Sequence, residues 1–165
     1  MTHYIVNQNV KGKISSPLFY YDCNFQPGAI IKNGVIIRPT SKLQKIILRD
    51  CFVDEAFIEG TKLQGDISIV RSTLLNCNLS RSENPAFNDC VIRYEGRHRY
   101  SLPILDGTFT DCSIHRCKLI EPTLKSSLNM DNSSLIYDEQ TLIARPEGVN
   151  WNFKNTEIIN AEIEY

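Results

Sequence analysis

Residues 41–65 read SKLQK IILRD CFVDE AFIEG TKLQG, which are five consecutive blocks of five residues. The third residue of every block is apolar, and the first is usually small. A second clean run, residues 107–126, reads GTFTD CSIHR CKLIE PTLKS. Because residues two apart on a β-strand point to the same face, the small and the central residue of each block face the same way. The period therefore predicts short strands, each with an inward-facing pair.

The six cysteines follow the same rule, since each lies two residues before an apolar residue. The pairs are Cys23 and Phe25, Cys51 and Val53, Cys77 and Leu79, Cys90 and Ile92, Cys112 and Ile114, and Cys117 and Leu119. This spacing predicts small interior wall residues rather than metal ligands or nucleophiles. The cysteines are spread over a chain of ordinary domain size, so we expect free thiols.

This period resembles that of the pentapeptide-repeat family, in which a small residue precedes a central leucine or phenylalanine by two positions. Cys23-Asn24-Phe25 and Cys77-Asn78-Leu79 match best, because the family usually carries Asp or Asn between the two. Elsewhere that slot holds residues such as Lys42, Phe52 and Phe57. The resemblance implies an all-β chain folded as a right-handed, four-sided parallel β-helix of about five coils. An irregular three-sided parallel β-helix would also place inward pairs two residues apart, and it stays open.

The length of 165 residues suits a single β-helix domain spanning 1–165. Residues 1–22 lack the five-residue period, so we expect an N-terminal cap followed by coils over 23–165. The period breaks near 80–86, 93–103 and 128–149. Because a packed interior has no room for extra residues, these breaks predict loops that project outward.

The charge balance of 18 basic and 19 acidic residues provides no overall field for nucleic acid or lipid. It argues against direct nucleic-acid binding. The sequence shows neither a leader pattern nor an apolar run that could cross a bilayer, so we expect a cytoplasmic protein without a membrane partner.

The segment 93–103 is the first candidate binding site. It gathers arginine and tyrosine, the side chains that most often anchor protein interfaces. The candidate contacts are Arg93, Tyr94, Arg97, His98, Arg99 and Tyr100.

Two further candidate surfaces follow from the register. Phe52 and Phe57 each precede a central residue, so they should face outward, where either the cap or an inserted loop covers them or a partner binds them. The sequence also ends in register, with Ile163 central and Tyr165 last. We expect either two copies to stack through this C-terminal coil as a homodimer or residues 128–148 to fold back over it.

Chemistry is not indicated. The register turns Cys112 and Cys117 inward and His115 outward, so these residues cannot converge on zinc. The sequence contains no nucleophile elbow, phosphate-binding loop or metal motif, and we expect no catalytic residue, metal or cofactor.

The sequence therefore favours a non-enzymatic protein-binding module that acts by occupancy, as an inhibitor, immunity or anti-defence protein does. The family resemblance implies an alternative, protection of DNA gyrase or topoisomerase IV by mimicry of DNA. A structural β-helix of a larger assembly and a small β-helix hydrolase are further alternatives.

Overall fold

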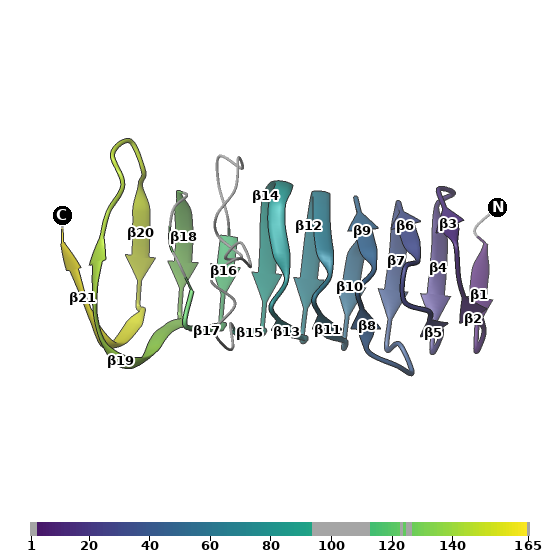
Figure 1. The fold of residues 1–165 in the computed structure, drawn as a ribbon, viewed down its shortest axis with the longest axis horizontal. Helices are drawn as coiled ribbons and strands as arrows, with labels where there is room; N and C mark the ends of the chain where they lie inside the picture. The colour runs from purple at the N-terminus through teal and green to yellow at the C-terminus, as the bar shows by residue number, and fades with distance from the viewer. Residues whose placement is uncertain (1–2, 94–112, 123, 125–126, 165) are drawn as a thin grey trace.

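The computed structural model describes residues 3–93, 113–122, 124 and 127–164, and these form a rod of stacked coils with the two ends of the chain at opposite ends (Figure 1). Strands and turns make up the described residues, with no helix among them. Strands in neighbouring coils pair in parallel, which confirms the expected all-β parallel β-helix.

The strands fall into three stacks, which we name sides 1, 2 and 3. Side 1 contains, in order along the rod, β1 (Tyr4–Val6), β4 (Leu18–Tyr21), β7 (Gly34–Ile37), β10 (Phe52–Asp54), β12 (Lys62–Val70), β14 (Asn78–Asn88), β16 (Ser113–His115), β18 (Leu128–Asp131) and β20 (Trp151–Lys154).

Side 2 contains β8 (Leu43–Gln44), β11 (Phe57–Glu59), β13 (Thr73–Leu75), β15 (Val91–Arg93), β17 (Lys118–Ile120), β19 (Ser134–Ala144) and β21 (Glu157–Glu164), and the pair β2 (Asn9–Val10) and β5 (Asn24–Phe25) takes this place in the first two coils. Side 3 contains β3 (Lys13–Ile14), β6 (Ile30–Lys32) and β9 (Ile47–Arg49), followed by the first half of β12 and of β14.

The register fixes the number of sides in each coil. Phe52 pairs with Val35 of the coil before and with Ser68 of the coil after, so partners lie 17 and 16 residues apart. A four-sided coil with five residues a side would separate them by about 20. The coils are therefore three-sided rather than four-sided. Side 1 has nine strands in the described chain, so the coils are also more numerous than the five expected.

Each side ends in a corner made by a residue with positive φ. In one coil the corners are Glu55, Gly60 and Gly65, each two residues after a central residue. Fifteen described corner or turn residues with positive φ are not glycine. A left-handed conformation costs such residues about 1 kcal/mol each. Hydrogen bonds between coils offset this cost; for example, the Asp50 N–H donates to the Gln64 carbonyl at 3.0 Å.

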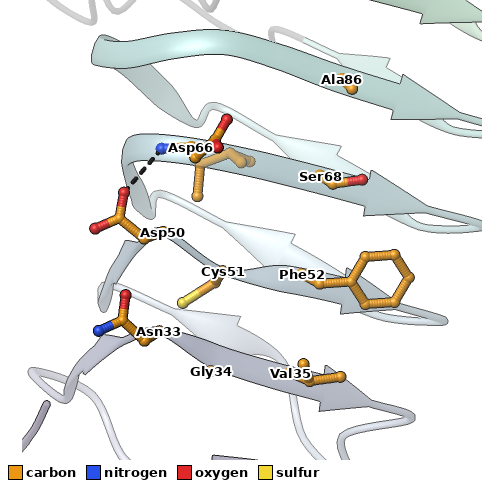
Figure 2. Close-up of a pocket in the computed structure, with 10 residues that line it drawn as sticks. Asn33, Gly34, Val35, Asp50, Cys51, Phe52, Asp66, Ser68 and Ala86 are labelled. Carbon is orange, nitrogen blue, oxygen red and sulfur yellow. Dashed lines mark hydrogen bonds between the residues drawn. The ribbon is translucent and has the colours of Figure 1, made fainter. Parts of the chain in front are cut away.

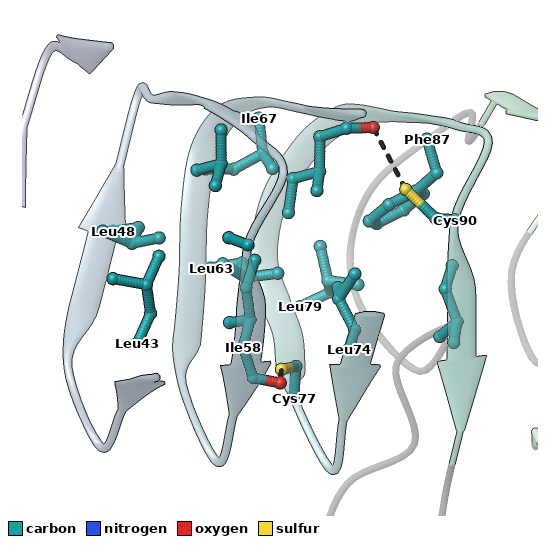
Figure 3. Packing of buried hydrophobic residues seen from close by; sticks show 14 of the residues in the cluster. Leu43, Leu48, Ile58, Leu63, Ile67, Leu74, Cys77, Leu79, Phe87 and Cys90 are labelled. Atoms are coloured by element: carbon teal, nitrogen blue, oxygen red, sulfur yellow. Dashed lines mark hydrogen bonds between the residues drawn. The ribbon is translucent and has the colours of Figure 1, made fainter. Parts of the chain in front are cut away.

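The core is a column of central residues along the rod axis, and Figure 3 shows it over consecutive coils. Leu43, Ile58 and Leu74 stack from side 2, while Leu48 and Leu63 stack from side 3. All five are fully buried. The inward orientation expected for the central residues is confirmed here.

Three segments differ from the expected organisation. Residues 4–14, expected to belong to a cap, form the first coil themselves, since β1, β2 and β3 pair with β4, β5 and β6. Residues 80–86 lie within β14 and run beside β12, with two register shifts in place of a projecting loop. Most of 128–149 is likewise strand, in β18 and β19. Backbone pairing along the rod absorbs these irregular segments because each extra residue still finds a partner strand.

Candidate protein-binding face

Side 1 carries outward-facing apolar residues in its first five strands. The residues on either side of the central one lie on the outer side of the sheet, because side chains alternate along a strand; they are apolar in β1, β4 and β7, whereas β10 and β12 pair Phe52 and Val70 with a buried Asp54 and with Ser68. The register aligns these residues in two columns that run along the rod. We name the set the apolar face: Tyr4, Val6, Phe19, Tyr21, Val35, Ile37, Phe52 and Val70.

Aromatic contacts join the apolar face into one surface. The Tyr4 ring lies 5.4 Å from the Phe19 ring and 5.9 Å from the Tyr21 ring, measured between centroids. Tyr4 is 61% exposed and Val6 is 47% exposed, while the remaining members are half-buried by their neighbours. A contiguous apolar patch of this kind is typical of a contact site.

The later coils of side 1 have polar residues in the same two columns. They are Asn88, His115, Asn129, Asp131, Asn152 and Lys154. The central residues face inward in both halves of side 1, so the outward positions of the two halves have the same structural role in the fold. The apolar character of the first half is therefore not required by the β-helix.

A shallow groove of about 440 Å³ runs along one edge of the apolar face (Figure 2). Val35 and Phe52 line its apolar wall, and Asn33 and Asp50 line the corner. Asp50 is held in place because its Oδ1 accepts a hydrogen bond from the backbone N–H of Asp66 at 2.9 Å. The groove thus places polar groups beside an apolar surface, as in the rim of an interface.

The opposite edge of side 1 carries alternating charges. The corner residue after each successive strand is, from β4 to β16, Asp22, Arg38, Glu55, Arg71, Asp89 and Arg116. We name this row the charge ladder. Ion pairs join its neighbours: Arg38 Nε lies 3.4 Å from Asp22 Oδ1, and Arg71 Nε lies 3.7 Å from Glu55 Oε1.

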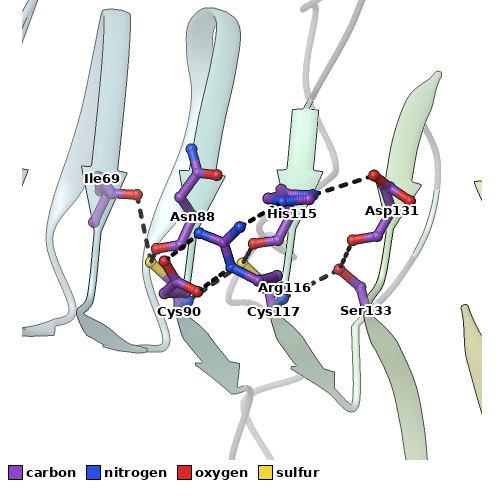
Figure 4. A network of polar contacts seen from close by, with 9 residues as sticks. Ile69, Asn88, Cys90, His115, Arg116, Cys117, Asp131 and Ser133 are labelled. Atoms are coloured by element: carbon purple, nitrogen blue, oxygen red, sulfur yellow. Dashed lines mark hydrogen bonds and ion pairs between the residues drawn. The ribbon is translucent and has the colours of Figure 1, made fainter. Parts of the chain in front are cut away.

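Two further contacts anchor the ladder. Arg71 makes a bidentate contact with Asp54, and donating hydrogen bonds to this carboxylate raises the pKa of the guanidinium. Arg116 binds both oxygens of Asp89 at 2.6 and 2.7 Å, which lowers the pKa of Asp89. Figure 4 shows this second group extended by His115, whose Nε2 lies 2.8 Å from Arg116 Nη1.

The predicted phenylalanines lie on different sides of the rod. Phe52 belongs to the apolar face on side 1. Phe57 is 38% exposed on side 2, where Lys42 Nζ lies 5.0 Å from its ring centroid. The cation–π contact offers Phe57 a partner within the chain. The two residues therefore do not form one contact surface.

The other predicted contacts are mostly beyond the part of the chain that the structure describes. Arg93 ends β15 and is exposed. Tyr94, Arg97, His98, Arg99 and Tyr100 lie outside the described residues, as does Tyr165. Ile163 lies in the last strand, paired with Ile143, and is half-buried. Contact through the 93–103 segment and stacking through the C-terminal coil stay predictions.

The described cysteines are buried and form no disulfide with one another, as expected. Cys51 Sγ donates to the carbonyls of Ile31 and Arg49, at 3.5 and 3.2 Å. Burial raises the pKa of Cys51 to about 11 and that of Cys77 to about 12, so both remain thiols at neutral pH. The sequence indicated small residues at these positions but not their hydrogen bonds. Thr61 and Ser72 also donate to carbonyls, those of Leu43 and Val70, and Ser72 in addition accepts from the Ala56 N–H.

His115 and Cys117 do not converge on a metal site, because Cys117 is buried and His115 lies on the outside of side 1. Cys112 lies outside the described residues. Among the residues that the structure describes, no group of three or more His, Cys, Asp or Glu side chains could hold a metal ion.

No family model and no curated protein matches this chain. The described residues include no helix that is long and apolar enough to cross a membrane. The surface of the β-helix is therefore the feature from which function is inferred.

Sequence reasoning identified only Phe52 among the members of the apolar face. Tyr4, Val6, Phe19 and Tyr21 were missed because they lie in the segment expected to form a cap. A signal was present in the three-residue runs YIV at 4–6 and FYY at 19–21, which are apolar or aromatic at every position.

Proposed function

We propose that this protein is a non-enzymatic protein-binding module that acts by occupying a surface of its partner, as an inhibitor, immunity or anti-defence protein does. The observation that carries the proposal is the apolar face, whose residues the fold does not need and whose side chains are partly exposed. A rigid β-sheet surface loses little conformational freedom on binding, which favours recognition by shape.

The size of the face sets the strength of contact that it can support. Five coils at about 4.8 Å each, and one side of the coil in width, give a strip of roughly 350 Å². Burial at about 25 cal/mol per Å² contributes about 9 kcal/mol from this strip and about 18 kcal/mol together with a matching area of the partner, before an entropy cost of association of about 4–15 kcal/mol. We therefore expect micromolar affinity from the apolar face alone, and tighter binding where the charge ladder or the 93–103 segment also makes contacts.

The alternatives receive less support from the surface. The five-residue period supports a relation to the pentapeptide-repeat proteins, although three-sided coils depart from the four-sided form that the resemblance implies. Along the charge ladder, positive and negative residues alternate, so this edge builds no DNA-like run of negative charge. Topoisomerase protection, a structural role, a hydrolase activity and a cytoplasmic location stay predictions.

Affinity capture with surface variants tests the proposal. The test variant carries Phe19→Ser, Val35→Ser and Phe52→Ser, which remove apolar area without touching the core. The matched control carries Asn129→Ser and Asn152→Ser, at the same column of side 1 in the polar half. Circular dichroism should show that both variants fold. We expect the test variant to lose a partner that the wild type and the control retain, whereas equal capture by all three proteins would refute the proposal.

A further inference from the structure

The two edges of the apolar face differ in charge. On the edge formed by the charge ladder, the sign changes from coil to coil: Asp22 after β4, Arg38 after β7, Glu55 after β10 and Arg71 after β12. Their side chains are about half exposed, so they can meet an approaching surface. The other edge carries Asn33, Asp50 and Asp66, and its one cationic neighbour among the residues described there is Arg49, whose Nε lies 3.8 Å from Asp50 Oδ2.

An alternating row of charges is complementary to an inverted copy of itself. If two rods pack face to face and antiparallel, the ladder of one copy lies against the ladder of the other, in reverse order. With the two-fold axis between two adjacent coils, every charge meets one of opposite sign. With the axis on a coil, every charge meets its own sign, so half of all registers are repulsive.

A parallel arrangement of the two rods is less favourable. It would place the charge ladder of one copy against the opposite edge of the other. Glu55 would then face the partner's Asp50, a like-charge contact, and Arg71 would face the partner's Asp66, an opposite-charge contact, so the cost and the gain offset each other, whereas the antiparallel arrangement opposes unlike charges at both ladder contacts. The charge pattern thus selects the antiparallel arrangement.

We propose that the apolar face binds a second copy of this chain, antiparallel, with the two-fold axis along the strands between β7 and β10. This centre keeps the largest part of the apolar face in contact. Arg38 then lies against the partner's Glu55, and Val35 lies against the partner's Phe52. The inference rests on the proposed function, because both need the apolar face to bury itself against protein.

The remaining contacts of this register are compatible with one another. Asp22 meets the partner's Arg71, and Tyr21 meets the partner's Val70. On the other edge Asn33 meets the partner's Asp50, where an amide N–H can donate to a carboxylate oxygen. Ile37 lies opposite the partner's Asp54, whose carboxylate is buried and already bound by Arg71.

The contact area predicts a weak, reversible dimer. The strip of roughly 350 Å² is about half of the area that each partner contributes to a standard interface. Association in the micromolar range is therefore expected, so that another protein could displace the second copy.

Sedimentation velocity on the full chain, from about 1 µM to about 1 mM, tests the inference. The wild type should pass from monomer to dimer over this range. Arg38→Glu and Glu55→Arg should each weaken association about tenfold, because each places like charges together twice across the two-fold axis. Arg116→Glu alters the same ladder beyond the apolar face and serves as the control, with association unchanged.

The decisive sample is an equimolar mixture of the Arg38→Glu and Glu55→Arg proteins. In a heterodimer of these variants both cross-contacts regain opposite charges, so the mixture should associate as the wild type does. Failure of the mixture to recover, or a wild type that is monomeric throughout, overturns the inference. If the wild type is monomeric but captures a partner that the serine variant loses, the inference fails and the proposed function stands. Association that persists in every variant overturns the antiparallel face and points to another contact, such as the C-terminal coil.

Discussion

Thr61 offers the sharpest test of how the coils are held together at their corners. The residue is fully buried, and its Oγ1 donates to the Leu43 carbonyl at 2.8 Å and lies 3.2 Å from the Glu59 carbonyl. One carbonyl belongs to the neighbouring coil and the other to the same corner. Thr61→Val keeps the volume and removes the hydroxyl, leaving both acceptors without this donor.

The expected loss is about 1–2 kcal/mol, since a buried polar group left without its partner costs about that much. For a chain of 165 residues this corresponds to a fall in Tm of about 3–6 °C. Thr61→Ser and Thr61→Cys are the matched controls, because serine and cysteine occupy equivalent corners at Ser72 and Cys51 and bond to carbonyls there. Thermal unfolding followed by circular dichroism measures all three. A Thr61→Val protein as stable as the wild type, or a Thr61→Ser protein as damaged as Thr61→Val, would refute the reasoning.

Three other predictions concern the corners and the core. Gly65→Ala should lower stability by about 1–3 kcal/mol, because Gly65 has a φ of +65° and a Cβ there would overlap the Asp50 carboxylate; urea unfolding measures the change, and a neutral effect would contradict it. Cys51 and Cys77 should resist a thiol reagent in the native protein at pH 8, because burial raises both pKa values, and they should react once denaturant unfolds the protein. Rapid labelling of the native protein would contradict this, because it would show that these corners open. Asp89 has a lowered pKa, so its contribution to stability is present above the ordinary value of 3.8 and is lost as pH falls through the lowered value. Arg116→Gln should therefore make the fall in stability between about pH 5 and about pH 3 shallower. Identical stability profiles of the variant and the wild type would argue against the ion pair.

The inward side of the fold could be predicted from the sequence because it repeats without exception in the clean run. Val53, Ile58 and Leu63 are each fully buried, and the small residue two positions earlier is also buried in each case. This regularity arises because the interior of every coil has the same width. Size and polarity are therefore restricted at these positions in a way that a single sequence reveals.

The number of sides was harder to predict. A five-residue side looks the same in a three-sided and a four-sided coil. The distinguishing signal is the extra residue between Leu63 and Ile69, which follows two regular sides and lies at the corner where side 3 meets side 1. A six-residue step also separates Phe25 from Ile31, and Ile31 lies one coil before Leu48 on side 3. A repeat of five, five and six residues closes a three-sided coil.

The first coil was missed for a reason that bears on function. In the run at 4–6 the central Ile5 is flanked by Tyr4 and Val6, so the contrast between inward and outward positions disappears. The apolar residues that form the candidate binding face are the same residues that hide the repeat. Such departures from a local pattern are expected where a surface serves binding rather than folding.

The most direct test of the account is methyl NMR of the full chain at rising concentration, or with a captured partner added. Signals of the outward methyl groups of Val35, Ile37 and Val70 on side 1 should shift or broaden. Those of Ile136 and Ile159, which face outward on side 2, should stay unchanged. Changes confined to Ile136, Ile159 or the terminal Ile163, with the side 1 methyl groups unaffected, would contradict the claim that the apolar face is the binding surface.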